Sequence, residues 1–79
     1  MRVRFFAGAA EAAGVDELVV ADAGQTGHDL VTVLAEGNQR LGEVLRVSSL
    51  LADGARVADL SAPLGVVDRV DVLPPFAGG

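Results

Sequence analysis

Few side chains in this 79-residue chain could carry out catalysis. There is no cysteine and a single histidine, His28, which excludes thiol nucleophiles, disulfides and zinc sites, so no metal or cofactor site is expected. His28 falls in the first turn of an expected helix, where a surface or capping role is favoured. The acidic pairs Asp16/Glu17 and Asp68/Asp71 could suggest acid–base chemistry, but solvated surface charges explain them better. The chain is therefore not expected to be an enzyme on its own.

The C-terminal segment is the part of the sequence with chemical potential. Gly78-Gly79 lacks side chains, so it could thread a channel too narrow for other residues and present its carboxylate to the active site of a partner. Pro74-Pro75 would project this segment as a semi-rigid arm with Phe76 as an anchor. A terminal carboxylate has a pKa of about 3.3–3.7, is ionised at neutral pH and needs activation, usually by ATP as an acyl-adenylate. A frayed end without a role is the alternative.

Composition excludes several other classes of function. All six basic residues are arginine, and the formal net charge is -5 with a pI near 4.5, which disfavours binding to nucleic acid and to anionic membranes. Without lysine there is no P-loop, and no G-x-G-x-x-G is present. With 51% hydrophobic and 22% charged residues, the chain is expected to fold as one domain, residues 1–79. No membrane span or signal peptide is predicted, so a cytoplasmic protein is expected.

Hydrophobic periodicity predicts the elements of the first half. Residues 2–6 alternate as in a half-buried strand, with Val3 and Phe5 facing the core, and residues 18–21 form a second strand. A turn of helix is possible around residues 9–13. Thr26 and Asp29 have the spacing of a capping box, so a helix begins there. Gly37-Asn38 ends it, and a second short helical piece is possible around residues 41–45.

The second half is expected to be mostly strand. Residues 50–52 run into Asp53-Gly54, a two-residue hairpin signal, and continue through residues 55–57. Residues 61–65 form a turn in which Leu64 is buried. The last strand, residues 70–73, is stopped by the two prolines. One main helix packed on one face of a mixed sheet is the economical arrangement, an α+β roll.

The ending Leu73-Pro74-Pro75-Phe76-Ala77-Gly78-Gly79 resembles that of the MoaD/ThiS family of ubiquitin-like sulfur carriers, most of all their molybdopterin synthase branch. Residues 3–7 and 62–64 are also similar. The resemblance implies a β-grasp roll with a flexible tail, residues 74–79. Two segments depart from the family: residues 66–68 replace Asp-Gly-Asp, and Asp53-Gly54 replaces Val-Asn. Because Val67 is β-branched and resists a positive φ, the turn before the last strand is expected to be of another type.

The resemblance also implies a mechanism. A partner adenylating enzyme would activate the carboxylate of Gly79, at the end of the Gly78-Gly79 pair, with ATP and Mg²⁺, and a persulfide-derived sulfur would displace AMP to leave a thiocarboxylate. The tail would then enter the large subunit of molybdopterin synthase, in a complex expected to be a heterotetramer. There Gly79 would donate sulfur to cyclic pyranopterin monophosphate in molybdenum cofactor biosynthesis. The active site would belong to the large subunit.

Strand parity suggests where partners bind. With Val3 and Phe5 facing inward, Phe6 and Leu73 fall on the opposite face, and the first and last strands are neighbours in a ubiquitin-like roll. They could form one exposed apolar patch near the root of the tail, joined by Val57; scattered surface hydrophobes are the alternative. The predicted partner interface comprises Phe6, Val57, Leu73, Pro74, Pro75, Phe76 and Ala77. Its predicted charged rim comprises Arg2, Arg4, Asp68 and Asp71.

Three other functions remain open from the sequence. A carrier of the thiazole (thiamine) pathway shares the Gly-Gly ending. A protein modifier would use the same tail to form isopeptide bonds with lysines of other proteins. A plain ubiquitin-like interaction domain would make no use of it. Because the chain has neither cysteine nor lysine, an activated Gly79 meets no internal thiol or ε-amine, which is compatible with a carrier.

Overall fold

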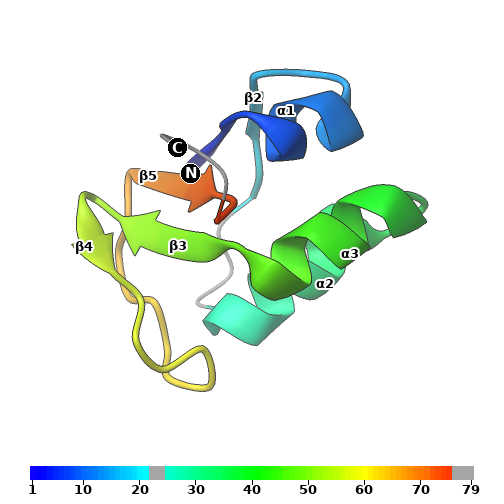
Figure 1. Cartoon of the computed structure of the whole chain (residues 1–79). Coiled ribbons are helices and arrows are strands. Elements are labelled where there is room, and N and C mark those ends of the chain that lie inside the picture. The colour runs from blue at the N-terminus through cyan, green and yellow to red at the C-terminus, as the bar shows by residue number, and fades with distance from the viewer. Residues whose placement is uncertain (22–24, 76–79) are drawn as a thin grey trace.

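The computed structural model describes residues 1–21 and 25–75, which form one layer of strands and one of helices (Figure 1). The elements are β1 (Arg2–Phe5), α1 (Gly8–Ala13), β2 (Glu17–Val19), α2 (Gly27–Ala35), α3 (Gln39–Val47), β3 (Ser49–Ala52), β4 (Ala55–Arg56) and β5 (Arg69–Leu73). The predicted order of elements is confirmed. The second helical piece, α3, is as long as α2, each having nine residues.

The sheet is mixed, with strand order β2-β1-β5-β3-β4. Its first and last strands, β1 and β5, are parallel neighbours at the centre, and the remaining pairs are antiparallel. Figure 1 shows α2 and α3 together on one side of this sheet. This is the predicted β-grasp roll. In the described part of the chain, no helix is long and apolar enough to cross a bilayer.

The core lies between the sheet and the helices. Val3, Val70 and Val72 on the central strands and Leu30 on α2 are the largest fully buried side chains. Phe5 is the aromatic member of the core, and aliphatic side chains make up the rest. Full burial of one such side chain stabilises a fold by about 1.5–3 kcal/mol. The inward positions of the central strands therefore match the predicted alternation.

The N-terminus of α2 is fixed by a capping box and by a close approach to the loop before β5. The Thr26 hydroxyl accepts a hydrogen bond from Asp29 N at 3.1 Å, and the Asp29 carboxylate accepts one from Thr26 N at 3.0 Å, as predicted. A Cβ on Gly27 would lie 2.7 Å from Leu60 Cδ2 and 3.2 Å from Leu60 Cα, so glycine permits this contact. His28 is exposed, and its backbone N–H donates to Leu60 O at 3.0 Å.

Asn38 joins the two ends of the helical layer. Its Oδ1 accepts a hydrogen bond from Leu41 N at 3.0 Å and so caps α3, while its Nδ2 donates to Ala12 O at 2.9 Å, near the end of α1. Gly37 before it has a φ of +69°, which glycine adopts without strain. The predicted break at these two residues is therefore a cap shared by neighbouring helices.

Asp53-Gly54 forms the predicted hairpin turn between β3 and β4 and also holds the start of β5. Both residues have positive φ, 47° and 86°. The Asp53 carboxylate accepts hydrogen bonds from Asp68 N at 3.2 Å and Arg69 N at 3.0 Å, and Asp53 N donates to Arg69 O at 2.9 Å. One side chain therefore connects two loops that are far apart in sequence.

The turn before β5 differs from the family pattern in the expected way. Gly65 takes the left-handed conformation, with a φ of +74°, whereas Val67 has no positive φ and is buried with 8% exposure. Val66 beside it is 96% exposed. Leu64, predicted to be buried, is half-buried and packs against the core. The positive φ therefore lies two residues before Val67.

We expect Asp53→Ala to lower the free energy of unfolding by about 1–3 kcal/mol, because alanine neither tolerates a positive φ nor accepts the two backbone hydrogen bonds. Asp53→Asn is the matched control, because asparagine tolerates this conformation and keeps a carbonyl acceptor. It is expected to cost less than about 1 kcal/mol. Urea denaturation of both variants measures the difference, and equal losses would contradict the dual role assigned to Asp53.

The loop after β4 contains a carboxyl group with a lowered pKa. The Ser61 hydroxyl donates to Asp59 Oδ1 at 2.5 Å and Ser61 N donates to the same atom at 2.9 Å, and these bonds hold the pKa of Asp59 below its usual value. A pKa lower in the folded state stabilises the fold above the unfolded pKa, and this contribution is lost as pH falls through the folded pKa.

We therefore expect Ser61→Ala to raise the pKa of Asp59 towards its ordinary value, because the hydroxyl supplies the largest part of the shift. An NMR titration of the Asp59 carboxyl carbon measures the midpoint in both proteins. Ser61→Thr keeps the hydroxyl and serves as the control. An unchanged midpoint in Ser61→Ala would show that the hydroxyl does not control this carboxyl.

Candidate partner-binding site

The parallel pairing of β1 and β5 brings Phe6 and Leu73 side by side. Phe5 is the register partner of Val72, and Phe6 N donates to Val72 O at 3.2 Å, so the ladder continues one residue beyond β1. Phe6 and Leu73 are half-buried and do not belong to the side chains packed against the core. They lie on the face of the sheet opposite the helices, which we call the outer face. The predicted adjacency is met, and its use by a partner is still a prediction.

Leu51 belongs to the same face and was not predicted. It is the register partner of Asp71 on β5, one position along from the Ser49–Leu73 pair. Its neighbour Leu50 is buried with 3% exposure, so alternation along β3 turns Leu51 outward. The three apolar residues 50–52 were interpreted as one strand without an assignment of faces. Alternation counted from the hairpin turn could have found Leu51.

Val57 does not join Phe6 and Leu73. It follows β4, and its N–H donates to Leu50 O at 2.9 Å, which places it beside an inward-facing residue. Its half-buried side chain packs against the core. The prediction that Val57 extends the patch is therefore corrected, because the register of the hairpin turns it to the helical side of the sheet.

The C-terminal segment leaves the sheet directly beside Leu73. Pro74 is buried and Pro75 is exposed, so the first proline is part of the folded body and the second begins the accessible part of the segment. Proline has no N–H to donate, which ends the ladder of β5 here. The predicted site residues Phe76, Ala77, Gly78 and Gly79 lie outside the described residues.

A cluster of charges surrounds the apolar part of the outer face. Asp71 is buried with 8% exposure, and its Oδ1 lies 3.2 Å from Arg69 Nε and 3.6 Å from Arg4 Nε. Both contacts are ion pairs, and neither Asp71 Oδ1 nor Arg69 Nε has a hydrogen-bond partner. The Arg4 guanidinium also lies over the Phe6 ring, 5.1 Å from its centroid, which is the geometry of a cation–π contact. Asp71 therefore orients the guanidinium groups next to Phe6.

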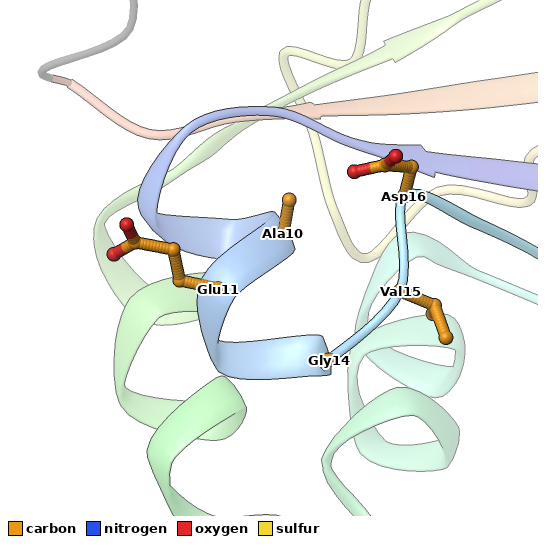
Figure 2. A pocket seen from close by; sticks show the side chains of 5 residues that line it. All are labelled: Ala10, Glu11, Gly14, Val15 and Asp16. Carbon is orange, nitrogen blue, oxygen red and sulfur yellow. The ribbon is translucent and has the colours of Figure 1, made fainter.

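The other hollows offer no convergent chemistry. Figure 2 shows one formed by Ala10, Glu11, Gly14, Val15 and Asp16 at the end of α1. Glu11 extends from the helix and Asp16 from the following loop, with Ala10 between them, so the two carboxylates do not converge. Among residues 1–21 and 25–75, no group of three or more His, Asp or Glu side chains could hold a metal ion. The outer face is therefore the candidate site, and its arrangement fits binding.

We expect Asp71→Asn to lower the free energy of unfolding by about 1–2 kcal/mol, between the values for exposed and buried ion pairs, because Arg4 and Arg69 are about 40% exposed. Asp68→Asn removes the same charge from an exposed neighbouring carboxylate and is expected to change stability by less than about 0.5 kcal/mol. Thermal unfolding at low and high salt measures both. Equal effects would show that Asp71 does not organise the cluster.

Solved structures share this fold over nearly the whole chain. SAMP1 of Haloferax volcanii, a small archaeal modifier protein, is 25% identical with a TM-score of 0.75, covering 99% of this chain and 97% of that chain. A Pyrococcus furiosus protein proposed to be molybdopterin converting factor subunit 1 is 24% identical with a TM-score of 0.77, covering 94% of each chain. A complex of subunits 1 and 2 of this factor from Helicobacter pylori includes a chain 23% identical with a TM-score of 0.66, covering 99% of this chain and 96% of that one.

Sequence comparison points the same way. No curated protein sequence matches the chain significantly. The model of the ThiS family matches residues 3–79, from β1 through the Gly-Gly ending. The sheet order, the position of the C-terminal segment after the central strand β5 and this match agree with one another. The chain belongs to the ThiS family of small ubiquitin-like sulfur carriers, which includes the MoaD branch.

Proposed function

We propose that this chain is the sulfur-carrying small subunit of molybdopterin synthase. A partner enzyme, using ATP and Mg²⁺, adenylates the Gly79 carboxylate with release of pyrophosphate, and sulfur displaces AMP to form a thiocarboxylate. The large subunit then receives the segment, and Gly79 donates its sulfur to cyclic pyranopterin monophosphate. The expected place of action, the cytoplasm, is part of this proposal.

The observation that carries the proposal is the family match that extends to Gly79. The whole of the Gly-Gly ending lies within the matched region, so the feature that would bear the sulfur is shared with the family. The molybdopterin assignment is supported by the Pyrococcus furiosus protein and by the Helicobacter pylori complex, whose names refer to molybdopterin converting factor. The same complex supports a second subunit as the partner.

The geometry of the outer face supports docking near the root of the segment. Phe6, Leu51 and Leu73 supply half-buried apolar surface on three adjacent strands, β1, β3 and β5. Pro75 is the first exposed residue after them. An extended chain spans at most about 3.3–3.6 Å per residue, so the segment from Pro75 to Gly79 can reach about 17 Å. That reach is enough to place a terminal carboxylate inside a partner while the sheet stays outside.

A protein modifier is the second candidate function. Its support is the 25% identity to SAMP1 of Haloferax volcanii over nearly the full length of both chains. In this case the activated Gly79 carboxyl would form an isopeptide bond with a lysine of another protein instead of accepting sulfur. The thiazole-pathway carrier uses the same loading chemistry with a different final acceptor. The family name itself is shared with that pathway's carriers.

We expect the purified chain, incubated with its adenylating enzyme, ATP, Mg²⁺ and a sulfur donor, to exchange one oxygen for sulfur at Gly79. Intact-protein and C-terminal peptide mass spectrometry measure the exchange. Deletion of Gly79 should abolish it. Gly78→Ala keeps the carboxylate but adds a methyl group where a narrow channel would exclude it, so its loading should be slower. Loading that persists after deletion of Gly79 would sink the carrier proposal.

Acceptor chemistry separates the remaining candidates. Rescue of a molybdenum-cofactor auxotroph, without rescue of a thiamine auxotroph, supports the synthase subunit, and the reverse result supports the thiazole pathway. Covalent high-mass adducts in cells, lost when Gly79 is deleted, support the modifier. Asp68→Asn is a matched control in all three assays, because it changes an exposed charge away from the tail.

A further inference from the structure

Arginine side chains gather on the outer face of the sheet. The register of β1 and β5 places Arg2 opposite Arg69 and Arg4 opposite Asp71, and on the other side of β5 Leu51 separates Asp71 from Arg56. Four of the six basic residues of the chain therefore lie on one face of a protein whose net charge is -5. The remaining two, Arg40 and Arg46, are on α3, across the sheet.

The negative groups of this face lie beneath or beside the positive ones. The Asp71 side chain is 11% exposed, whereas those of Arg4 and Arg69 are 39% and 41% exposed. The Asp53 carboxylate already accepts two backbone hydrogen bonds. The exposed carboxylates, Glu17 and Asp68, are at the edges, on the outermost strand β2 and in the loop before β5. A molecule that approaches the centre of the face therefore meets guanidinium groups first.

This arrangement is electrostatically unfavourable in the isolated chain. Like charges directly opposite each other on neighbouring strands destabilise a sheet, and Arg2 and Arg69 are such a pair. They line a polar hollow together with Asp53 and Asp68. Within the part of the chain that the structure describes, ion pairs shorter than 4.0 Å involve Arg4 and Arg69 but not Arg2 or Arg56. An external carboxylate would relieve the repulsion.

We propose that the outer face is a cationic docking surface for the partner protein that receives the C-terminal segment, and that this partner presents aspartate or glutamate carboxylates around an apolar strip. The inference rests on the proposed function, since the segment must be held by such a partner. The apolar strip packs on Phe6, Leu51 and Leu73, which are continuous with the arginines across β1, β5 and β3. Guanidinium groups bind carboxylates through two parallel hydrogen bonds, which fixes orientation as well as charge.

Two of the arginines are already held in place. Asp71 lies within 4.0 Å of both Arg4 and Arg69, and Arg4 also rests over the Phe6 ring. Side chains that are fixed before binding lose less conformational entropy when the complex forms. Arg2 and Arg56 are exposed and supply the outer charges that attract a partner during approach. The net negative charge of the rest of the chain opposes nucleic acid and anionic lipid as occupants.

The test compares Arg2→Gln/Arg56→Gln with Arg40→Gln/Arg46→Gln. Both double variants remove two positive charges from exposed positions, on opposite sides of the sheet. Stopped-flow association with the adenylating enzyme and with the large synthase subunit from the same organism is measured over a range of salt concentrations. The outer-face variant should associate about tenfold more slowly with at least one partner at low salt, with a weaker salt dependence. The α3 variant should stay within about twofold of the unmodified chain.

A second measurement separates docking from folding. The melting temperature of Arg2→Gln/Arg56→Gln should not fall, because the substitution removes the repulsion between Arg2 and Arg69. Equal association rates for both double variants, or no binding of the unmodified chain to either partner, would overturn the docking proposal. Arginine-dependent binding to phosphatidylserine vesicles or to single-stranded DNA, with unchanged partner rates, would also overturn it. A chain that docks as predicted but never acquires sulfur contradicts the proposed function alone.

Discussion

The parallel, in-register pairing of β1 with β5 is the constraint on which the rest of the structure depends. On the inner side it sets Val3 against Val70 and Phe5 against Val72, which are the centre of the core. On the outer side the same ladder sets Arg4 against Asp71 and brings Phe6 to Leu73. One register therefore determines both the stability of the fold and the composition of the candidate site.

Parallel strands cannot be joined by a tight turn, so nearly the whole chain lies between β1 and β5. The β5 strand becomes central only when β3 covers its other edge, and the Asp53 carboxylate then secures its first residues. The C-terminal segment leaves from this central, doubly paired strand. A firm base with the reactive carboxylate several residues away suits a carrier that must enter partner proteins without unfolding.

The distribution of charge gives the two sides of the sheet different roles. The helical side buries aliphatic side chains and supplies most of the stability, whereas the outer side holds four arginines over the buried Asp71. Such a charge cluster is a costly way to stabilise a small domain, because the arginines repel one another and two buried polar atoms lack hydrogen bonds. The cost is understandable if the charges act in association with a partner.

Local sequence determined much of this protein. The capping box of Thr26 and Asp29, the Asp53-Gly54 hairpin and the inward alternation of Val3 and Phe5 were all predictable, because each depends on residues within a few positions of one another. The chemical character of the Gly-Gly ending is likewise written in the sequence, although its residues lie outside the described ones. Two faces of every strand can be listed from alternation alone.

Only the tertiary structure decided which distant residues meet. It turned Val57 to the core, added Leu51 to the outer face and buried Pro74, and it set Arg2 opposite Arg69. The physical reason is that strand register joins residues dozens of positions apart, and a shift of one residue exchanges the two faces. Local patterns supply the candidates for a site, and the packing of the whole chain selects which of them share a surface.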